Sequence, residues 1–142
     1  MKYPVLLLIV LPLLAACSTL STSRTPAADL GGLKRIHVEH RLADGRGLDE
    51  LMARELKGLG YEASNGPLTL MPPKVDAIVS YEDRWTFDFT TYLIGFEVAV
   101  RDARTGKALA SGHYFRPSFS GNDPAEVIAQ MLRALFPRRR AA

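Results

Sequence analysis

The sequence predicts an α+β domain, in which a mixed, mainly antiparallel sheet of four or five strands carries two helices in the order β-α-β-β-β-β-α. Two amphipathic helical patterns are separated by several alternating, strand-like segments, which is typical of this class. The chain has 142 residues, of which 47% are hydrophobic and 23% charged, as expected for one ordinary globular domain.

The first half of the domain reads as a strand followed by a helix. Residues Leu33 to Leu42 alternate between apolar and polar, which predicts a half-buried strand. A helix is expected next, with Gly60 as its left-handed C-cap. Its apolar residues recur at helical spacing: Leu48, Leu51, Met52, Leu56 and Leu59. A short strand at Tyr61–Ser64 and a proline-containing loop are predicted to follow.

The second half reads as an antiparallel meander whose three strands pair in sequence order. These strands are Ala77–Phe87, Tyr92–Arg101 and Ala108–Phe115, and Gly106 supplies positive φ in the last turn. In the first strand one face is expected to hold Val79, Tyr81, Trp85 and Phe87. In the middle strand one face is expected to hold Tyr92, Ile94, Phe96, Val98 and Val100.

The closing helix has a clear start and stop. Asp123 is an N-cap acceptor, Pro124 occupies the first helical position, and Glu126 lies three residues after the cap. Pro137 ends the helix. Its apolar stripe comprises Val127, Ile128, Met131, Leu132, Leu135 and Phe136, so we expect this face to pack on the sheet.

The N-terminus has the features of an export signal. Lys2 precedes the apolar stretch Pro4–Leu13, which is too short to cross about 30 Å of hydrocarbon comfortably. The following Leu14-Ala15-Ala16-Cys17 resembles the lipobox of bacterial lipoproteins. The resemblance implies that residues 1–16 are cleaved and that Cys17 receives a diacylglycerol, whose acyl chains anchor the protein in a membrane. An ordinary secretory signal with an incidental cysteine is the alternative.

The segments after Cys17 set the predicted location and boundaries. Ser18 follows the cysteine, and in proteobacterial lipoproteins the absence of aspartate at this position implies the outer membrane, with the protein facing the periplasm. Residues 17–29 are expected to be the lipidated cysteine and a flexible tether, 30–137 the single domain, and 138–142 a basic tail. That tail, solvated or in contact with anionic headgroups, accounts for the excess of basic residues, so no nucleic-acid partner is expected.

The sequence contains no pattern typical of metal, cofactor or catalytic chemistry. His37 and His40 are three apart on a predicted strand and should face opposite sides, so no metal site is expected. Ser111, near His113, lies in no nucleophile elbow. The carboxylates Glu82, Asp83 and Asp88 read as solvated strand residues, and Gly45-Arg46-Gly47 lacks the rest of a nucleotide-binding motif. We therefore expect no enzyme and no cofactor.

The segment from Asp83 to Tyr92 is the best candidate for a binding site. It concentrates aromatic residues near a predicted hairpin tip, namely Trp85, Phe87, Phe89 and Tyr92. Core packing would explain them, but side chains that project beyond the sheet would form a patch for a protein partner. The sequence leaves both interpretations open.

The order of elements, with the turn Asp102-Ala103-Arg104-Thr105-Gly106-Lys107, resembles small periplasm-facing lipoproteins of proteobacteria. Their fold is similar to the N-terminal domain of the Tol-system propeller protein and to lipoprotein activators of penicillin-binding proteins. The predicted function is a non-catalytic protein-interaction module in envelope assembly or maintenance. The alternative is a binding module for a small envelope lipid or glycan fragment, which would need an apolar pocket between sheet and helices.

Overall fold

The computed structural model describes residues 19–25, 28–116 and 123–140. The strands are β1 Thr19–Arg24, β2 Arg35–Glu39, β3 Glu62–Gly66, β4 Ala77–Asp88, β5 Thr90–Asp102 and β6 Ala108–Phe115. The helices are α1 Leu48–Gly58 and α2 Pro124–Leu135, with short 3-10 turns η1 Leu30–Gly32 and η2 Leu68–Leu70. Within the described residues no helix is long and apolar enough to cross a membrane.

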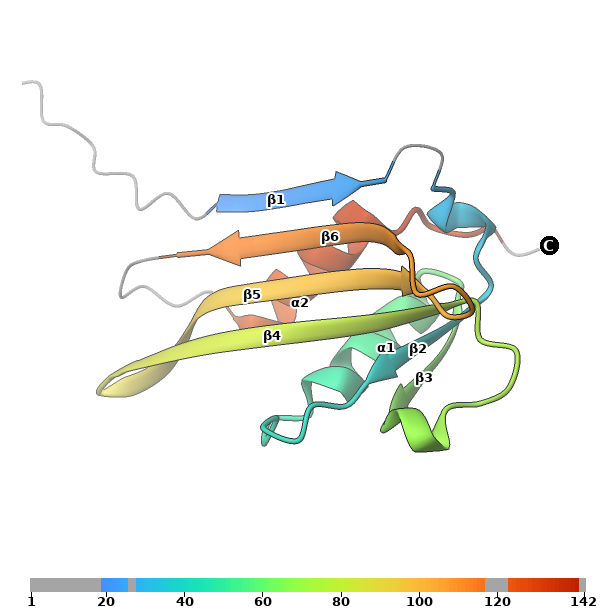
Figure 1. Cartoon of the computed structure of the whole chain (residues 1–142). Coiled ribbons are helices and arrows are strands. Elements are labelled where there is room, and N and C mark those ends of the chain that lie inside the picture. Colours follow the sequence, from blue (N-terminus) through green and yellow to red (C-terminus); the bar gives the residue numbers. More distant parts are fainter. Residues whose placement is uncertain (1–18, 26–27, 117–122, 141–142) are drawn as a thin grey trace, which may run out of the picture.

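The six strands form one mixed sheet in the order β1-β6-β5-β4-β2-β3. Strand β2 runs parallel to both β3 and β4, whereas the pairs β4 with β5, β5 with β6 and β6 with β1 are antiparallel. Both helices cover the same face, and the other face is open (Figure 1). The core lies between the two helices and the face of the sheet that they cover, and it includes Ile36, Val38, Met52, Leu56, Phe96, Ile128, Met131 and Leu132. The predicted α+β class is confirmed.

The predicted helix signals are also confirmed. Gly60 adopts φ 96° just after α1, where a side chain would meet the backbone of Arg139. The Asp123 side chain accepts a hydrogen bond from the Ala125 backbone N–H at the start of α2, and Pro124 occupies the first turn. The meander β4-β5-β6 pairs in sequence order, and Gly106 takes φ 74° in its last turn.

The predicted number of strands was too low, because the sheet has a sixth strand, β1, in the segment expected to be a flexible tether. All six residues of β1 are exposed and polar or small apart from Leu20, so no alternation marks them as a strand. Backbone pairing with β6 holds β1 in place. The guanidinium of Arg24 adds hydrogen bonds to the carbonyls of Ala134 and Leu135 at the end of α2, at 3.0 and 2.7 Å.

The predicted face of β5 was wrong beyond Gly95, because the strand contains a β-bulge. Arg84 pairs with Gly95 but Trp85 pairs with Leu93, so Ile94 is an extra residue without a partner on β4. The bulge reverses the alternation, and Leu93 takes the core side in place of Ile94 and Tyr92. Phe96, Val98 and Val100 face the core as predicted.

Candidate functional site

The β4–β5 hairpin projects beyond the rest of the sheet, as Figure 1 shows. Strand β6 pairs with β5 only as far as Gly95, so residues 85–93 of the hairpin pair with one another alone. Beyond the helices Phe87 is 75% exposed and Phe89 98%. Trp85 is half-buried against the core and Tyr92 is half-buried as well. The structure therefore divides the predicted aromatic patch into an exposed pair, Phe87 and Phe89, and two aromatics nearer the root.

Phe89 occupies the tip in a left-handed conformation, with φ 56°. This region is uncommon for residues other than glycine, asparagine and aspartate, and an aromatic side chain gains nothing from it. An exposed phenylalanine in a strained backbone adds little to folding. The sequence thus keeps a bulky apolar group at a position where glycine would be more stable.

The loop between β2 and α1 braces the root of the hairpin. The Arg41 guanidinium pairs with the Asp83 carboxylate, and the other oxygen of Asp83 accepts a hydrogen bond from the Trp85 indole N–H at 2.6 Å. The Arg46 guanidinium lies 3.9 Å from the centre of the Trp85 ring, where a cation–π interaction forms. These contacts fix the point from which the tip projects. The exposed Leu42 lies in the same loop.

Asp44 anchors this loop to the sheet and to the start of α1. The N-cap position is held by Gly47, which has no side chain to accept the first helical N–H groups. The buried carboxylate of Asp44 accepts the first of these instead, from Leu48 at 2.8 Å, and it also accepts hydrogen bonds from the Arg46 backbone N–H at 2.7 Å and the Tyr81 hydroxyl at 2.6 Å. Burial alone would raise the pKa of Asp44, but the bonds from Tyr81 and these backbone groups outweigh it and lower the pKa.

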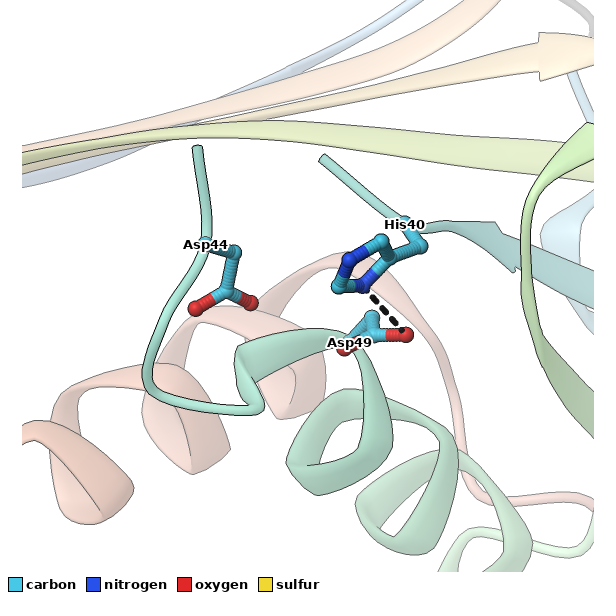
Figure 2. Close-up of side chains that lie close together, drawn as sticks. All are labelled: His40, Asp44 and Asp49. Atoms are coloured by element: carbon cyan, nitrogen blue, oxygen red, sulfur yellow. Dashed lines mark ion pairs between the residues drawn. The ribbon is translucent and has the colours of Figure 1, made fainter. Parts of the chain in front are cut away.

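His40, Asp44 and Asp49 gather at the same point (Figure 2), with ligand-type atoms within 4.8 Å of one another. This spacing could hold a metal ion, whereas the prediction of no metal site rested on the opposite facing of His37 and His40 and did not include Asp44 and Asp49. The carboxylates are already engaged, however. Asp49 Oδ2 lies 3.2 Å from His40 Nδ1 and accepts a hydrogen bond from the Asn65 amide at 3.0 Å. These contacts give the cluster a structural role, which is to hold the β2–α1 loop in place.

The other polar candidates are separate from one another. His37 is buried, with its ring nitrogens 2.8 Å from Ser64 Oγ and 3.0 Å from the Gly66 carbonyl. His113 faces Glu97 on the open face, not Ser111. Glu82 is exposed, whereas Asp83 belongs to the brace. Cys17 lies outside the described residues, and only the backbone of Asp88 is described.

The space between sheet and helices is filled by core side chains, so the apolar pocket required by the small-ligand alternative is not found there among the described residues. A shallow hollow of about 600 Å³ lies along the sheet instead. On the open face it is lined by small and polar residues, namely Ser21, Ser23, Ser80, Glu82, Glu97, Ala99, Ser111 and His113.

The fold is similar to that of solved bacterial proteins. The PelC dodecamer from Paraburkholderia phytofirmans superposes with a TM-score of 0.59 at 17% identity, over 88% of this chain and all of that chain. A single-substitution variant of the PelC dodecamer from the same organism gives the same TM-score of 0.59 at 19% identity. A DUF4136 family protein from Bacteroides thetaiotaomicron gives 0.50 at 9% identity, over 82% of this chain and 92% of that chain.

No protein-family model matches the chain, and no curated protein sequence matches it. At these levels of identity the structural likeness shows the fold alone.

Proposed function

We propose that this chain is a membrane-anchored lipoprotein of the cell envelope that acts as a non-catalytic interaction module in envelope assembly or maintenance. The lipobox at Cys17 supports the anchoring, and the outer membrane facing the periplasm is the expected location. The chain's fold likeness to PelC and to a DUF4136 protein is consistent with such a role.

The observation that carries the proposal is the exposed pair Phe87 and Phe89 on a braced hairpin. Aromatic side chains dominate binding energetics, and the brace lowers the entropy lost when they are covered. The two buried carboxylates near His40, those of Asp44 and Asp49, already accept hydrogen bonds from backbone N–H groups, Tyr81 and Asn65. Binding rather than chemistry therefore agrees best with the geometry.

The proposal is tested on the full-length chain expressed in a bacterial envelope. Mass spectrometry of the mature N-terminal peptide should find acyl chains on Cys17, and the Cys17→Ala form should lack them and remain uncleaved. A photo-crosslinking residue at position 89 should then capture a specific envelope component, whereas the same residue at position 107, on the turn before β6, should not. Absence of lipid on Cys17, or equal capture from both positions, would count against the proposal.

A further inference from the structure

We propose that the tip of the β4–β5 hairpin enters the surface of the same bilayer that holds the lipid on Cys17. This inference rests on the anchoring proposed above and names what covers Phe87 and Phe89. It follows from where β1 begins relative to the hairpin, from how far the hairpin projects, and from the size and chemistry of its tip.

The chain enters the domain at the end from which the hairpin projects. Thr19, the first residue of β1, pairs with Phe115 of β6, and Phe115 pairs with Gly95 of β5. Thr19 therefore lies level with the root of the hairpin, and β1 runs away from the tip (Figure 1). Cys17 is two residues before Thr19, so the covalent chain allows it to reach at most about 7 Å beyond this level.

The hairpin reaches farther than the anchor can. From Arg84, the partner of Gly95, to Asp88, the partner of Thr90, β4 advances four residues, which at about 3.3 Å per residue amounts to roughly 13 Å, because the bulged residue Ile94 adds no length. With the strands pointing toward the membrane, the tip would lie at least about 6 Å deeper than Cys17. Apolar groups of interfacial proteins are buried about 5–10 Å into the headgroup and acyl boundary, so the two lengths agree.

Exposed apolar side chains gather at this end of the molecule. Among the described residues seven large hydrophobic side chains are exposed, and two of these, Leu68 and Leu70, lie on η2 beside strand β3. The other five lie on the hairpin, on the ends of β1 and β6 beside it, and in the brace loop: Phe87, Phe89, Leu20, Phe115 and Leu42. A single apolar end next to a lipid anchor is the distribution that membrane contact requires.

The residues behind the tip suit the headgroup region. Trp85 and Tyr92 lie nearer the root, and tryptophan and tyrosine are the aromatics enriched at membrane interfaces. Arg46 places a cation over Trp85, where it could meet anionic headgroups. The sequence of residues 84–96 contains one acidic residue, Asp88, which lies at the tip between Phe87 and Phe89.

The tip is too small to serve as a protein interface alone. Two phenylalanine side chains offer about 150–250 Å² each, whereas a stable interface buries roughly 800 Å² on each partner. Their neighbours at the tip, Thr90 and Thr91, are exposed and polar. A bilayer accepts a small apolar protrusion without a matching surface, so it fits these side chains better than a protein does.

The test places a single tryptophan at the tip of the lipidated, full-length protein. Trp85 is the only tryptophan, so W85F with F89W leaves one reporter at the tip, and W85F with K107W leaves one on the turn before β6 at the opposite end. Both proteins are reconstituted with phosphatidylethanolamine and phosphatidylglycerol vesicles that carry spin labels on the acyl chains. Flotation with the vesicles and tryptophan fluorescence are measured together.

We expect both proteins to float, and only the tip reporter to shift its emission to shorter wavelength and be quenched by the acyl-chain labels. A protein that floats with an unshifted, unquenched tip reporter would overturn the insertion while leaving the anchoring intact. A protein that does not float would overturn the anchoring, and the insertion with it. Capture of one protein rather than lipid from the photo-crosslinker at position 89 would assign the tip to a protein partner.

Discussion

The two halves of the β4–β5 hairpin both carry aromatic residues, but these are buried in one half and exposed in the other. Phe96 lies in the half flanked by β6 and covered by the helices, and it is fully buried. Phe87 and Phe89 lie in the projecting half, past the bulge at Ile94, and are exposed. What covers a strand, more than the hydrophobicity of the strand itself, therefore decides whether its aromatic residues build the core.

The two halves of the hairpin also differ in whether their residues suit folding stability or binding. The covered half of the hairpin satisfies the usual rules, with apolar side chains alternating toward the helices. The projecting half departs from them, with an aromatic residue at positive φ and two exposed phenylalanines. Departures of this kind are expected where function rather than folding selects the residues.

The largest expected effect is at the covered end. Phe96→Ala should lower the free energy of unfolding by about 3–5 kcal/mol, because it leaves a cavity among core side chains. Phe87→Ala, the matched change at the projecting end, should lower it by less than about 0.5 kcal/mol. Urea denaturation of the purified proteins measures both. Similar losses for the two variants would show that the tip also supports the fold.

The β2–α1 loop, which Asp44 anchors, contacts the hairpin where its covered and projecting halves meet. Asp44→Ala should lower the free energy of unfolding by about 2–4 kcal/mol. The change removes the acceptor for the Leu48 N–H at the start of α1 and for the Arg46 N–H in the loop, and it leaves the buried Tyr81 hydroxyl without an acceptor for its proton. Urea denaturation measures the loss. A change below about 0.5 kcal/mol would mean that the loop does not depend on Asp44.

The Asp44 carboxylate should also make the free energy of unfolding depend on pH in the acid range. The pKa of Asp44 in the folded protein lies below its ordinary value of 3.8, so folding favours the ionised carboxylate. Its contribution is fully present above about pH 5 and is lost as the pH falls through the unfolded value and then the lower folded value. Between about pH 5 and pH 2, Asp44→Asn should therefore lose less stability than the unmodified protein. Equal acid slopes would contradict the assignment.

A smaller effect on stability is expected from two glycine substitutions, one on the covered face of the sheet and one at an open position on α1. A side chain at Gly112 would clash with the sulfur of Met131, so Gly112→Ala should cost about 1–3 kcal/mol by overpacking α2 against β6. Gly58 on α1 has nothing within 4 Å, and Gly58→Ala should instead add up to about 1 kcal/mol through helix propensity. Thermal denaturation of the pair gives the comparison. A destabilised Gly58→Ala protein would contradict it.

The smallest stability effect is expected at the tip. Phe89→Gly should raise the free energy of unfolding by up to about 1 kcal/mol, because glycine accepts φ 56° without strain. The same change should reduce the contact that the tip makes with the bilayer. Denaturation measures the first effect, and quenching of Trp85 fluorescence by spin-labelled vesicles measures the second, since the lipid on Cys17 would let the protein float with or without the tip contact. A destabilised Phe89→Gly protein would show that the phenylalanine is kept for folding.

Local signals in the sequence predicted much of the fold. Asp123 and Pro124 start α2, and Gly60 ends α1, because caps depend on a few neighbouring residues. Strand β1 and the bulge at Ile94 could not be predicted in this way. The polar residues of β1 are held by pairing with β6, about ninety residues away, and by Arg24 at the end of α2.

The candidate site was predicted in part. The aromatic segment was identified from composition, but its division into the exposed Phe87 and Phe89 and the half-buried Trp85 depends on where the helices stop covering the sheet. The roles of Asp44 and Asp49 were missed. The spacing of His40, Asp44 and Asp49 was a visible signal, although their convergence requires the turn that Gly47 makes before α1.

By itself the sequence determined the class of fold, both helices, the C-cap of α1, the N-cap of α2 and the meander, because each depends on periodicity or on a short motif. The lipid attachment at Cys17 stays a prediction. Only the tertiary structure decided that β1 begins at the end where the hairpin projects, and that Phe87 and Phe89 lie beyond the cover of the helices. Both follow from long-range strand pairing and from the extent of helix packing. Neither leaves a local mark in the sequence.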